Sequence, residues 1–568
     1  MKTAIKFLLF IFLSITLIAG SSAQTQEKID RGEIALVKDN GKNFISWRLL
    51  ETDRSGISFD IYRKDIGIED YVKINEEPVS RTNYMDSGIF HGRAYEYQVI
   101  PAGSKPERKK RGAYVFTMQY PVPYVSIKLK TKDTPRNVGI ADLDGDGRYD
   151  FVVKYPDFNV DPWNATGYWK RSPEPFKLEA YTSQGEHLWT YDMGWSIETG
   201  TWYSPYLVYD IDGDGFAEVY CKGGEGDPRE IDGHVMTGPE YLVKIDGRTG
   251  KVVRRIDWIS KEGFENYNYW SRNFLGMAFL NGVTPSIVLQ RGTYTIIKSM
   301  ALNKELEQEW YWESTGNYEN YKGQGQHGMQ TADIDNDGKD ELIIGSAVLD
   351  DDGMPMWTTG LGHNDVGHVA DIDPENPGLE IFYGLETSQS RHGVCLVDAL
   401  TGKMLWAYEG STVHVHGQGM AADIDPAYPG MECYAGEAKG GSKYFLYSAG
   451  GERLSDKDMG SLSPRPVWWD SDDLKEVVIG DKLLKYKGQT LMNIEGNILM
   501  VGDIVGDWRE EIVTGLPGEL RIYSTTLPGE DRRIALVQDR QYRLGVSRST
   551  MGYYYPPQLS LKYTWDSE

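Results

Sequence analysis

The sequence has few cysteines, no long helical pattern and no second apolar run of membrane-spanning length. Its 568 residues include only Cys221, Cys395 and Cys433, which are too few and too scattered for a disulfide framework. We therefore expect buried free thiols. No long segment repeats apolar residues with the 3.6-residue period of an amphipathic helix. These absences favour a large all-β protein that folds without disulfides.

Positive charge is also scarce. The chain has 60 Lys and Arg residues against 84 Asp and Glu, a formal net charge of −24. Such a surplus of negative charge argues against nucleic acid as a partner. It would also repel an anionic polysaccharide unless cations lie where the polymer binds. The placement of the acidic residues is therefore the most informative feature of the sequence.

The N-terminus has the parts of an export signal. Lys2 and Lys6 precede an apolar run at 7–19, and small residues at 21–23 suit a cleavage site. The run is too short for a comfortable membrane span, and no later run is long enough. Residues 1–23 are predicted to be a signal peptide, so we expect a periplasmic or secreted chain without a membrane span.

Residues 24–122 are predicted to form a small β-sandwich. The segments 44–47, 58–63 and 94–99 alternate apolar and polar positions, as half-buried strands do. Their spacing and the single Trp47 are similar to a fibronectin type III domain. The basic stretch 108–111 is interpreted as a solvated turn.

From residue 123 to residue 568 an acidic motif recurs about every 50 residues. Clear copies begin at Asp142, Asp210 and Asp333, and two variants begin at Asp371 and Asp423. Weaker copies lie at 469–476 and 503–511, and a degenerate one lies at 280–282. A short β-branched run follows each copy. This period suits four-stranded units arranged radially, so an eight-bladed β-propeller is predicted rather than a linear solenoid, whose repeat would be shorter.

The acidic turns are predicted calcium sites. Alternate carboxylates on a tight turn converge on one point, and a distal carboxylate completes an oxygen cage that suits Ca²⁺. Without cations these carboxylates would repel one another. The predicted metal ligands are Asp142, Asp144, Asp146, Asp150, Asp210, Asp212, Asp214, Glu218, Asp333, Asp335, Asp337, Glu341, Asp371, Asp373, Glu380, Asp423, Asp425 and Glu432.

Histidines gather in one stretch of the chain. Six of the nine lie between positions 327 and 416. His327, His368 and His416 each precede an acidic copy at short range, which predicts that they occupy similar places on innermost strands and face a central channel. Such a cluster suits β-elimination on an acidic sugar: a base removes the C5 proton of a uronate while a cation stabilises the charge on its carboxylate.

Several motifs resemble the bacterial rhamnogalacturonan lyases of polysaccharide lyase family 11. They lie at 360–363, 420–426, 506–511 and 542–545, beside the acidic turns. The resemblance implies an eight-bladed propeller, several Ca²⁺ ions and a cleft that splits rhamnose–galacturonate links in rhamnogalacturonan I. The predicted catalytic residues are His363, His327, His416, Tyr553 and Arg291, and the predicted substrate contacts are Tyr294, Gln418, Arg391 and His368.

The sequence departs from the family pattern at cationic positions. Gln418 stands where the family has Arg, Glu495 falls near a family Lys, and Glu198 replaces another Arg. A lyase for a different uronate polysaccharide therefore stays open, as does a non-catalytic calcium-stabilised binding propeller. The chain is expected to be a monomer.

Overall fold

The computed structural model describes residues 27–39, 41–90, 92–107, 112–116, 121–163 and 168–563. The predicted signal peptide, residues 1–23, and the basic stretch 108–111 lie outside the described residues. Strands dominate the described residues, which confirms the all-β class. Cys221, Cys395 and Cys433 are buried and free, as expected. None of the described helices combines the length and the apolar character that crossing a membrane requires.

The N-terminal part consists of two antiparallel sheets packed face to face. One has the strand order β1-β2-β5 and the other β4-β3-β6-β7. Trp47, Phe59 and Tyr97 are fully buried in the core between them. The strands are β1 (Ile34–Asp39), β2 (Lys42–Ser46), β3 (Phe59–Asp65), β4 (Val72–Lys73), β5 (Asn83–Asp86), β6 (Ala94–Pro101) and β7 (Ala113–Phe116).

The rest of the described chain folds into four-stranded antiparallel meanders. Each begins with an inner strand and steps outward. In chain order they are β9 to β12 (Asn137–Ala141, Asp150–Tyr155, Lys177–Tyr181, His187–Asp192), β13 to β16 (Tyr206–Tyr209, Glu218–Gly224, Glu240–Asp246, Val252–Asp257), β17 to β20 (Asn273–Ala278, Ser286–Arg291, Lys298–Leu302, Gln308–Glu313) and β21 to β24 (Gly325–Ala332, Glu341–Gly345, Ala347–Leu349, Pro355–Thr358).

The second half of the chain repeats the pattern. It contains β25 to β28 (Asn364–Ala370, Glu380–Leu385, Val394–Asp398, Met404–Ala407), β29 to β32 (Val415–Ala422, Glu432–Glu437, Tyr444–Tyr447, Arg453–Ser455), β33 to β36 (Arg465–Val467, Glu476–Ile479, Lys482–Leu484, Thr490–Asn493) and β37 to β39 (Asn497–Gly502, Glu511–Leu516, Glu519–Tyr523). A strand from the start of this region, β8 (Tyr124–Lys128), pairs with β39 and completes the last sheet.

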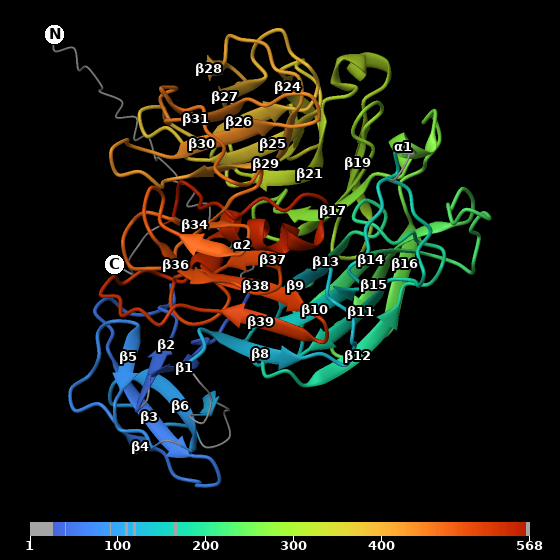
Figure 1. The fold of residues 1–568 in the computed structure, drawn as a ribbon. Coiled ribbons are helices and arrows are strands. Elements are labelled where there is room, and N and C mark those ends of the chain that lie inside the picture. The colour runs from blue at the N-terminus through green and yellow to red at the C-terminus, as the bar shows by residue number, and fades with distance from the viewer. Residues whose placement is uncertain are drawn as a thin grey trace, which may run out of the picture.

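The inner strands form a closed circle of contacts. Each of β9, β13, β17, β21, β25, β29 and β33 touches the next, and β37 returns to β9 (Figure 1). One parallel bridge, between Gln326 and Asn364, joins the meanders that begin at β21 and β25 into a continuous sheet. The N-terminal sheets lie beside the last meander, where Arg48 donates to the carbonyl of Ile504.

Each acidic motif forms the turn between the first and second strands of a meander. The copy at 142–150 joins β9 to β10, and the copy at 333–341 joins β21 to β22. The apolar runs that follow, such as Phe151–Val153, become second strands buried between neighbouring meanders. The sequence repeat therefore corresponds to the structural repeat.

Helices are short and lie mostly near the C-terminus. They are α1 (Tyr267–Trp270), η1 (Gly316–Tyr321), η2 (Leu536–Gln538), α2 (Arg540–Ser547) and η3 (Arg548–Thr550). Asp539 caps α2 by accepting from the backbone N–H of Tyr542. Helix α2 contacts the inner strands β9, β13, β17, β21 and β37, so the C-terminal segment crosses the middle of the ring. It brings Tyr553 to His327 on β21.

Closure of the ring by β8 gives a stability prediction. Ile127 on β8 is 2% exposed and packs in the core between the first and last meanders. Ile127→Ala should destabilise the protein by about 2–5 kcal/mol through lost apolar contact and a residual cavity. Lys128→Ala, at an exposed site on the same strand, should leave the melting temperature nearly unchanged. Equal melting temperatures for the two variants would show that closure by β8 adds little stability.

Candidate active site

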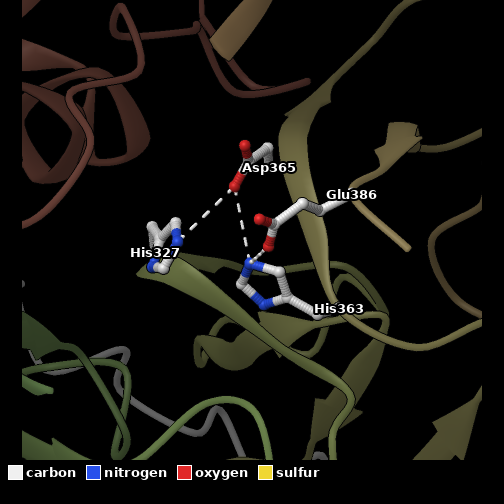
Figure 2. Close-up of side chains that lie close together, drawn as sticks. All are labelled: His327, His363, Asp365 and Glu386. Atoms are coloured by element: carbon white, nitrogen blue, oxygen red, sulfur yellow. Dashed lines mark ion pairs between the residues drawn. The ribbon is translucent and has the colours of Figure 1, made fainter. Parts of the chain in front are cut away.

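Side chains from three adjacent meanders meet near the ring axis. His327 lies on β21, Asp365 on β25 and His416 on β29. His363 immediately precedes β25, and Glu386 immediately follows β26. The inner strands converge here, so residues far apart in sequence become neighbours (Figure 2). The prediction that His327, His368 and His416 occupy inner strands is confirmed.

Four of these residues surround one point. The Nε2 atom of His363 lies 3.0 Å from Glu386 Oε2 and 3.4 Å from Asp365 Oδ1. His327 Nε2 lies 3.6 Å from the same Asp365 oxygen (Figure 2). Asp365 is fully buried, and both histidines are 4% exposed. This set is called the central cluster below.

The protonation of His363 is set by its surroundings. Its Nδ1 lies 2.6 Å from the carbonyl of Gly325, an acceptor, so Nδ1 carries the proton and Nε2 faces the carboxylates. Burial lowers the pKa of His363, but Asp365 and Glu386 outweigh burial and raise it to about 9. Burial, followed by the charges of His363 and Arg272, lowers the pKa of His327 well below its ordinary value.

A second group adjoins the central cluster. His416 Nδ1 lies 2.5 Å from Asp365 Oδ2, and His414 Nε2 lies 3.6 Å from Glu386 Oε1. Both histidines are more open to solvent than the central cluster: the side chain of His416 is 26% exposed and that of His414 18% exposed. A pocket of about 520 Å³, lined by Tyr294, His363, Glu386 and His414, opens beside these residues.

The central cluster fits a divalent cation. Its two imidazoles and two carboxylates offer ligand atoms within 4.8 Å of one another. Both oxygens of Asp365 and the Nε2 of His363 are buried; within the described residues they have ion-pair contacts with the neighbouring imidazoles and Glu386 but no well-aligned hydrogen bond. Buried charges in that condition are usually paired with a counter-ion or a metal. Carboxylates suit Ca²⁺ or Mn²⁺, whereas imidazoles favour transition metals, so the donor set is mixed.

The predicted calcium turns are a separate set of candidate sites. In three of them the predicted ligands come together: Asp142, Asp144 and Asp146; Asp210, Asp212 and Glu218; Asp333, Asp335 and Glu341. Glycines 147, 215 and 338 occupy the same turn position with φ of 85°, 90° and 94°, a left-handed conformation that glycine adopts easily. One oxygen each of Asp212, Asp333, Glu341, Asp423 and Glu432 is buried and has no hydrogen-bond partner among the described residues, which fits an added cation.

The distal carboxylates also have a structural role that the sequence did not suggest. Each accepts the backbone N–H of the second residue of its own turn. These pairs are Asp150 with Leu143, Glu218 with Ile211, Glu341 with Ile334, Glu380 with Ile372, and Glu432 with Ile424. A distal carboxylate therefore closes the turn whether or not a metal is bound.

Lysines supply positive charge in some turns. Lys244 Nζ lies 3.0 Å from Asp212 and 2.8 Å from Glu218. Lys487 lies 2.7 Å from Asp425, and Lys562 lies 2.6 Å from Asp333. The remaining predicted ligands, Asp214, Asp337, Asp371 and Asp373, lie on the same turns between first and second strands. All the predicted ligands therefore lie either in these turns or on the first residue of the second strand, at the same end of each inner strand.

Aromatic and cationic side chains surround the central cluster. The Tyr294 hydroxyl lies 3.0 Å from His327 Nε2 and donates to Glu386 at 3.2 Å. Tyr553 packs its ring 5.0 Å from that of His327. Arg272, 2% exposed, stacks on Trp202 and Tyr294 with its guanidinium 5.1 and 4.9 Å from the ring centroids.

The sequence prediction missed several of these residues. Asp365 could have been found, since it lies two positions after His363 and alternate residues of a strand share a face. Glu386, Trp202 and Arg272 gave no local signal. Each lies outside the strands: Glu386 follows β26, Arg272 precedes β17, and Trp202 lies in the connection between β12 and β13.

Other predicted site residues lie outside the central cluster. Arg291 is fully buried and pairs with Glu240 at 2.7 Å. His368 donates from Nε2 to the carbonyl of Gln418 at 2.7 Å, so these two lie together. Arg391 is exposed on the loop between β26 and β27. Of the predicted catalytic set, the structure groups His363, His327, His416 and Tyr553, and places Arg291 elsewhere.

Known proteins match the whole of this architecture. A family model for the C-terminal domain of rhamnogalacturonan lyase family 11 matches residues 129–564, and one for the β-sheet domain of rhamnogalacturonan I lyases matches residues 24–114. The rhamnogalacturonan endolyase YesW of Bacillus subtilis (strain 168) is 34% identical over 619 residues, which cover 99% of this chain and 95% of YesW. The exolyase YesX of the same organism is 32% identical over 592 residues, covering 94% of each chain.

The crystal structure of a relative confirms that the similarity extends to the fold. The crystal structure of YesW superposes with a TM-score of 0.85 at 32% identity and covers 96% of this chain and 98% of that one. The fold and its relatives define the chain as a polysaccharide lyase. It belongs to rhamnogalacturonan lyase family 11, which confirms the resemblance seen in the sequence.

Metal content should distinguish turns that need an ion from turns that carry a lysine. Asp144→Asn should remove one tightly bound divalent ion and lower the melting temperature, because the carboxylates of Asp142, Asp144 and Asp146 lie together. Asp472→Asn is the matched control: Lys485 already lies 2.6 Å from Asp470, 2.9 Å from Asp472 and 3.2 Å from Glu476. Elemental analysis after dialysis should show a loss only for the first variant. An equal metal content in both would contradict calcium binding at the Asp142 turn.

The ion pairs that Glu240 forms with Arg291 and Lys222 predict that the stability of the protein depends on pH. Burial raises the pKa of Glu240, but Lys222 and Arg291 outweigh burial and hold it at about 2. A depressed carboxyl pKa stabilises the fold above the unfolded value of about 4.3, and this contribution, about 3 kcal/mol, is lost as the pH falls toward 2. Glu240→Gln should therefore destabilise the protein at pH 6, and its difference from the wild type should shrink below pH 4.5.

Melting curves across that pH range test this prediction. Glu174→Gln, which removes an exposed partner of Lys177, is the control and should show no such trend. A wild-type–Glu240→Gln difference that stays constant between pH 6 and pH 3 would contradict the assignment.

Proposed function

We propose that this protein is an exported, calcium-dependent rhamnogalacturonan lyase that cleaves the backbone of rhamnogalacturonan I by β-elimination at galacturonate. The observation that carries the proposal is the central cluster: two buried imidazoles and two carboxylates around one point, beside a pocket of about 520 Å³. Family membership and the names of YesW and YesX support the substrate. The motif at residues 1–23 supports export.

The architecture is proposed to be an eight-bladed β-propeller at residues 123–568, behind a fibronectin type III-like sandwich at residues 24–122. The closed circle of inner-strand contacts supports the propeller, as does the pairing of β8 with β39. The boundary between the two parts falls between β7, which ends at Phe116, and β8, which begins at Tyr124.

The central cluster would hold the cation through His327, His363, Asp365 and Glu386. When bound, a divalent cation there supplies positive charge to the galacturonate carboxylate and so makes the neighbouring C5 proton more acidic. The bound cation would thereby offset the repulsion between a negatively charged polymer and a negatively charged protein. Arg272 adds a fixed cation next to Tyr294.

His416 is the proposed base. Its Nδ1 lies 2.5 Å from Asp365, so the carboxylate orients the ring and leaves Nε2 to take the C5 proton. The C4–O4 bond then breaks, a C4=C5 double bond forms, and the departing O4 needs a proton. Tyr553 is the proposed donor, because burial raises its pKa well above the ordinary value and keeps it protonated.

Histidine variants separate the two roles. His416→Ala should lower kcat on rhamnogalacturonan I by about 100-fold or more while metal content stays intact, as expected for loss of a general base. His363→Ala should lose turnover and bound metal together. His187→Ala, on the outer strand β12, is the control and should retain activity.

Turnover is measured by the ultraviolet absorbance of the unsaturated uronate product. Product from rhamnogalacturonan I that disappears with a chelator and returns with calcium supports the proposal. Product only from another uronate polymer would move the substrate to that polymer. An active, metal-replete His416→Ala variant would exclude His416 as the base.

A further inference from the structure

Two arginines near the ring axis pair with no carboxylate of the described residues. Arg465 begins the inner strand β33, and Arg548 begins η3 in the segment that crosses the ring. Both side chains are partly buried. Within the part of the chain that the structure describes, no carboxylate forms an ion pair with either guanidinium, and the phenols Tyr554 and Tyr555 lie near both. Unpaired buried cations are unexpected in a chain with a net charge of −24.

The two arginines share one neighbourhood. Arg465 donates from Nη1 to the carbonyl of Tyr554 at 2.5 Å and lies 5.3 Å from the centroid of its ring. After burial, which has the largest influence, the charges of both arginines act on the pKa of Tyr554, Tyr555 and His368. The same three side chains therefore lie near both guanidinium groups.

None of these neighbours supplies negative charge. The Tyr554 hydroxyl donates to the carbonyl of Val501, and the Tyr555 hydroxyl donates to the carbonyl of Asp365 at 2.6 Å. A phenol that donates is protonated and uncharged. Burial, followed by the two arginines, lowers the pKa of His368 to about 4, so this imidazole is neutral at neutral pH.

Arg548 has N–H groups that donate no hydrogen bond to the described residues. The Nε and Nη1 atoms of Arg548 are buried and have no hydrogen-bond partner within the described residues. Buried guanidinium N–H groups that lack hydrogen bonds are costly. Planar N–H donors of this kind match the two oxygens of a carboxylate.

We propose that Arg465 and Arg548 form a binding site for a carboxylate anion near the ring axis, distinct from the central cluster. The carboxylate comes either from a small free anion or from a galacturonate unit of the polymer. In the second case the site rests on the proposed function. In the first case it is independent of that function.

Binding is tested by thermal melting of the full chain at constant ionic strength. Acetate and D-galacturonate should raise the melting temperature by about 2 °C, whereas the neutral probes acetamide and galactose should not. Arg548→Gln and the double variant Arg465→Gln/Arg548→Gln should lose this shift. Arg521→Gln, whose guanidinium pairs with Glu519, is the matched control and should keep it.

Kinetics distinguish the two sources of the carboxylate. A KM for rhamnogalacturonan I raised several-fold in Arg548→Gln, with kcat little changed, assigns the site to the polymer. Unchanged kinetics with a lost acetate shift assign it to a free anion. If Arg548→Gln, which keeps the Arg465 bond to the backbone, responds to acetate as the wild type does, the site is refuted. The same holds if the wild type shows no difference between acetate and acetamide.

Discussion

The structure depends on bringing many carboxylates close together while supplying positive charge to balance them. Neighbouring carboxylates in a partly buried turn repel one another, and burial makes their ionised forms more costly. Burial and nearby acids raise the pKa of Asp142 to about 6 and that of Asp150 to about 8. A turn of this kind is stable at neutral pH when a cation joins it. Lysine supplies that cation at some turns, as Lys485 does, and other turns have the geometry for a metal ion.

The acidic turns also have a structural role that needs no cation. The distal carboxylate of each copy accepts a backbone N–H at the start of its own turn, so the acidic motif fixes the step from the first strand to the second. Repetition of this step gives every meander a similar geometry. The inner strands can then meet around one axis, and β8 completes the last meander.

The region around the axis is where the repeats differ from one another. Meanders beginning at β21, β25 and β29 contribute His327, Asp365 and His416, and the C-terminal segment contributes Tyr553. As in the acidic turns, carboxylates here lie close to positive charge, but the groups around the axis are more deeply buried and include imidazoles. Nearby, Arg465 and Arg548 form no ion pair with a carboxylate of the described residues. The proposed cation site and the proposed carboxylate site therefore both lie near the axis.

The sequence alone determined the all-β class, the family and the positions of the acidic turns, because these depend on local patterns: alternating strands, a repeat of fixed spacing and carboxylates a few residues apart. It also placed three histidines on inner strands, since each precedes a turn at a similar distance. Only the tertiary structure decided which side chains meet. Glu386 meets His363 in the central cluster, Arg272 stacks on Tyr294 beside it, and Arg291 pairs with Glu240 away from it. The reason is that contacts across a closed ring depend on how neighbouring meanders pack, and no short stretch of sequence encodes that packing.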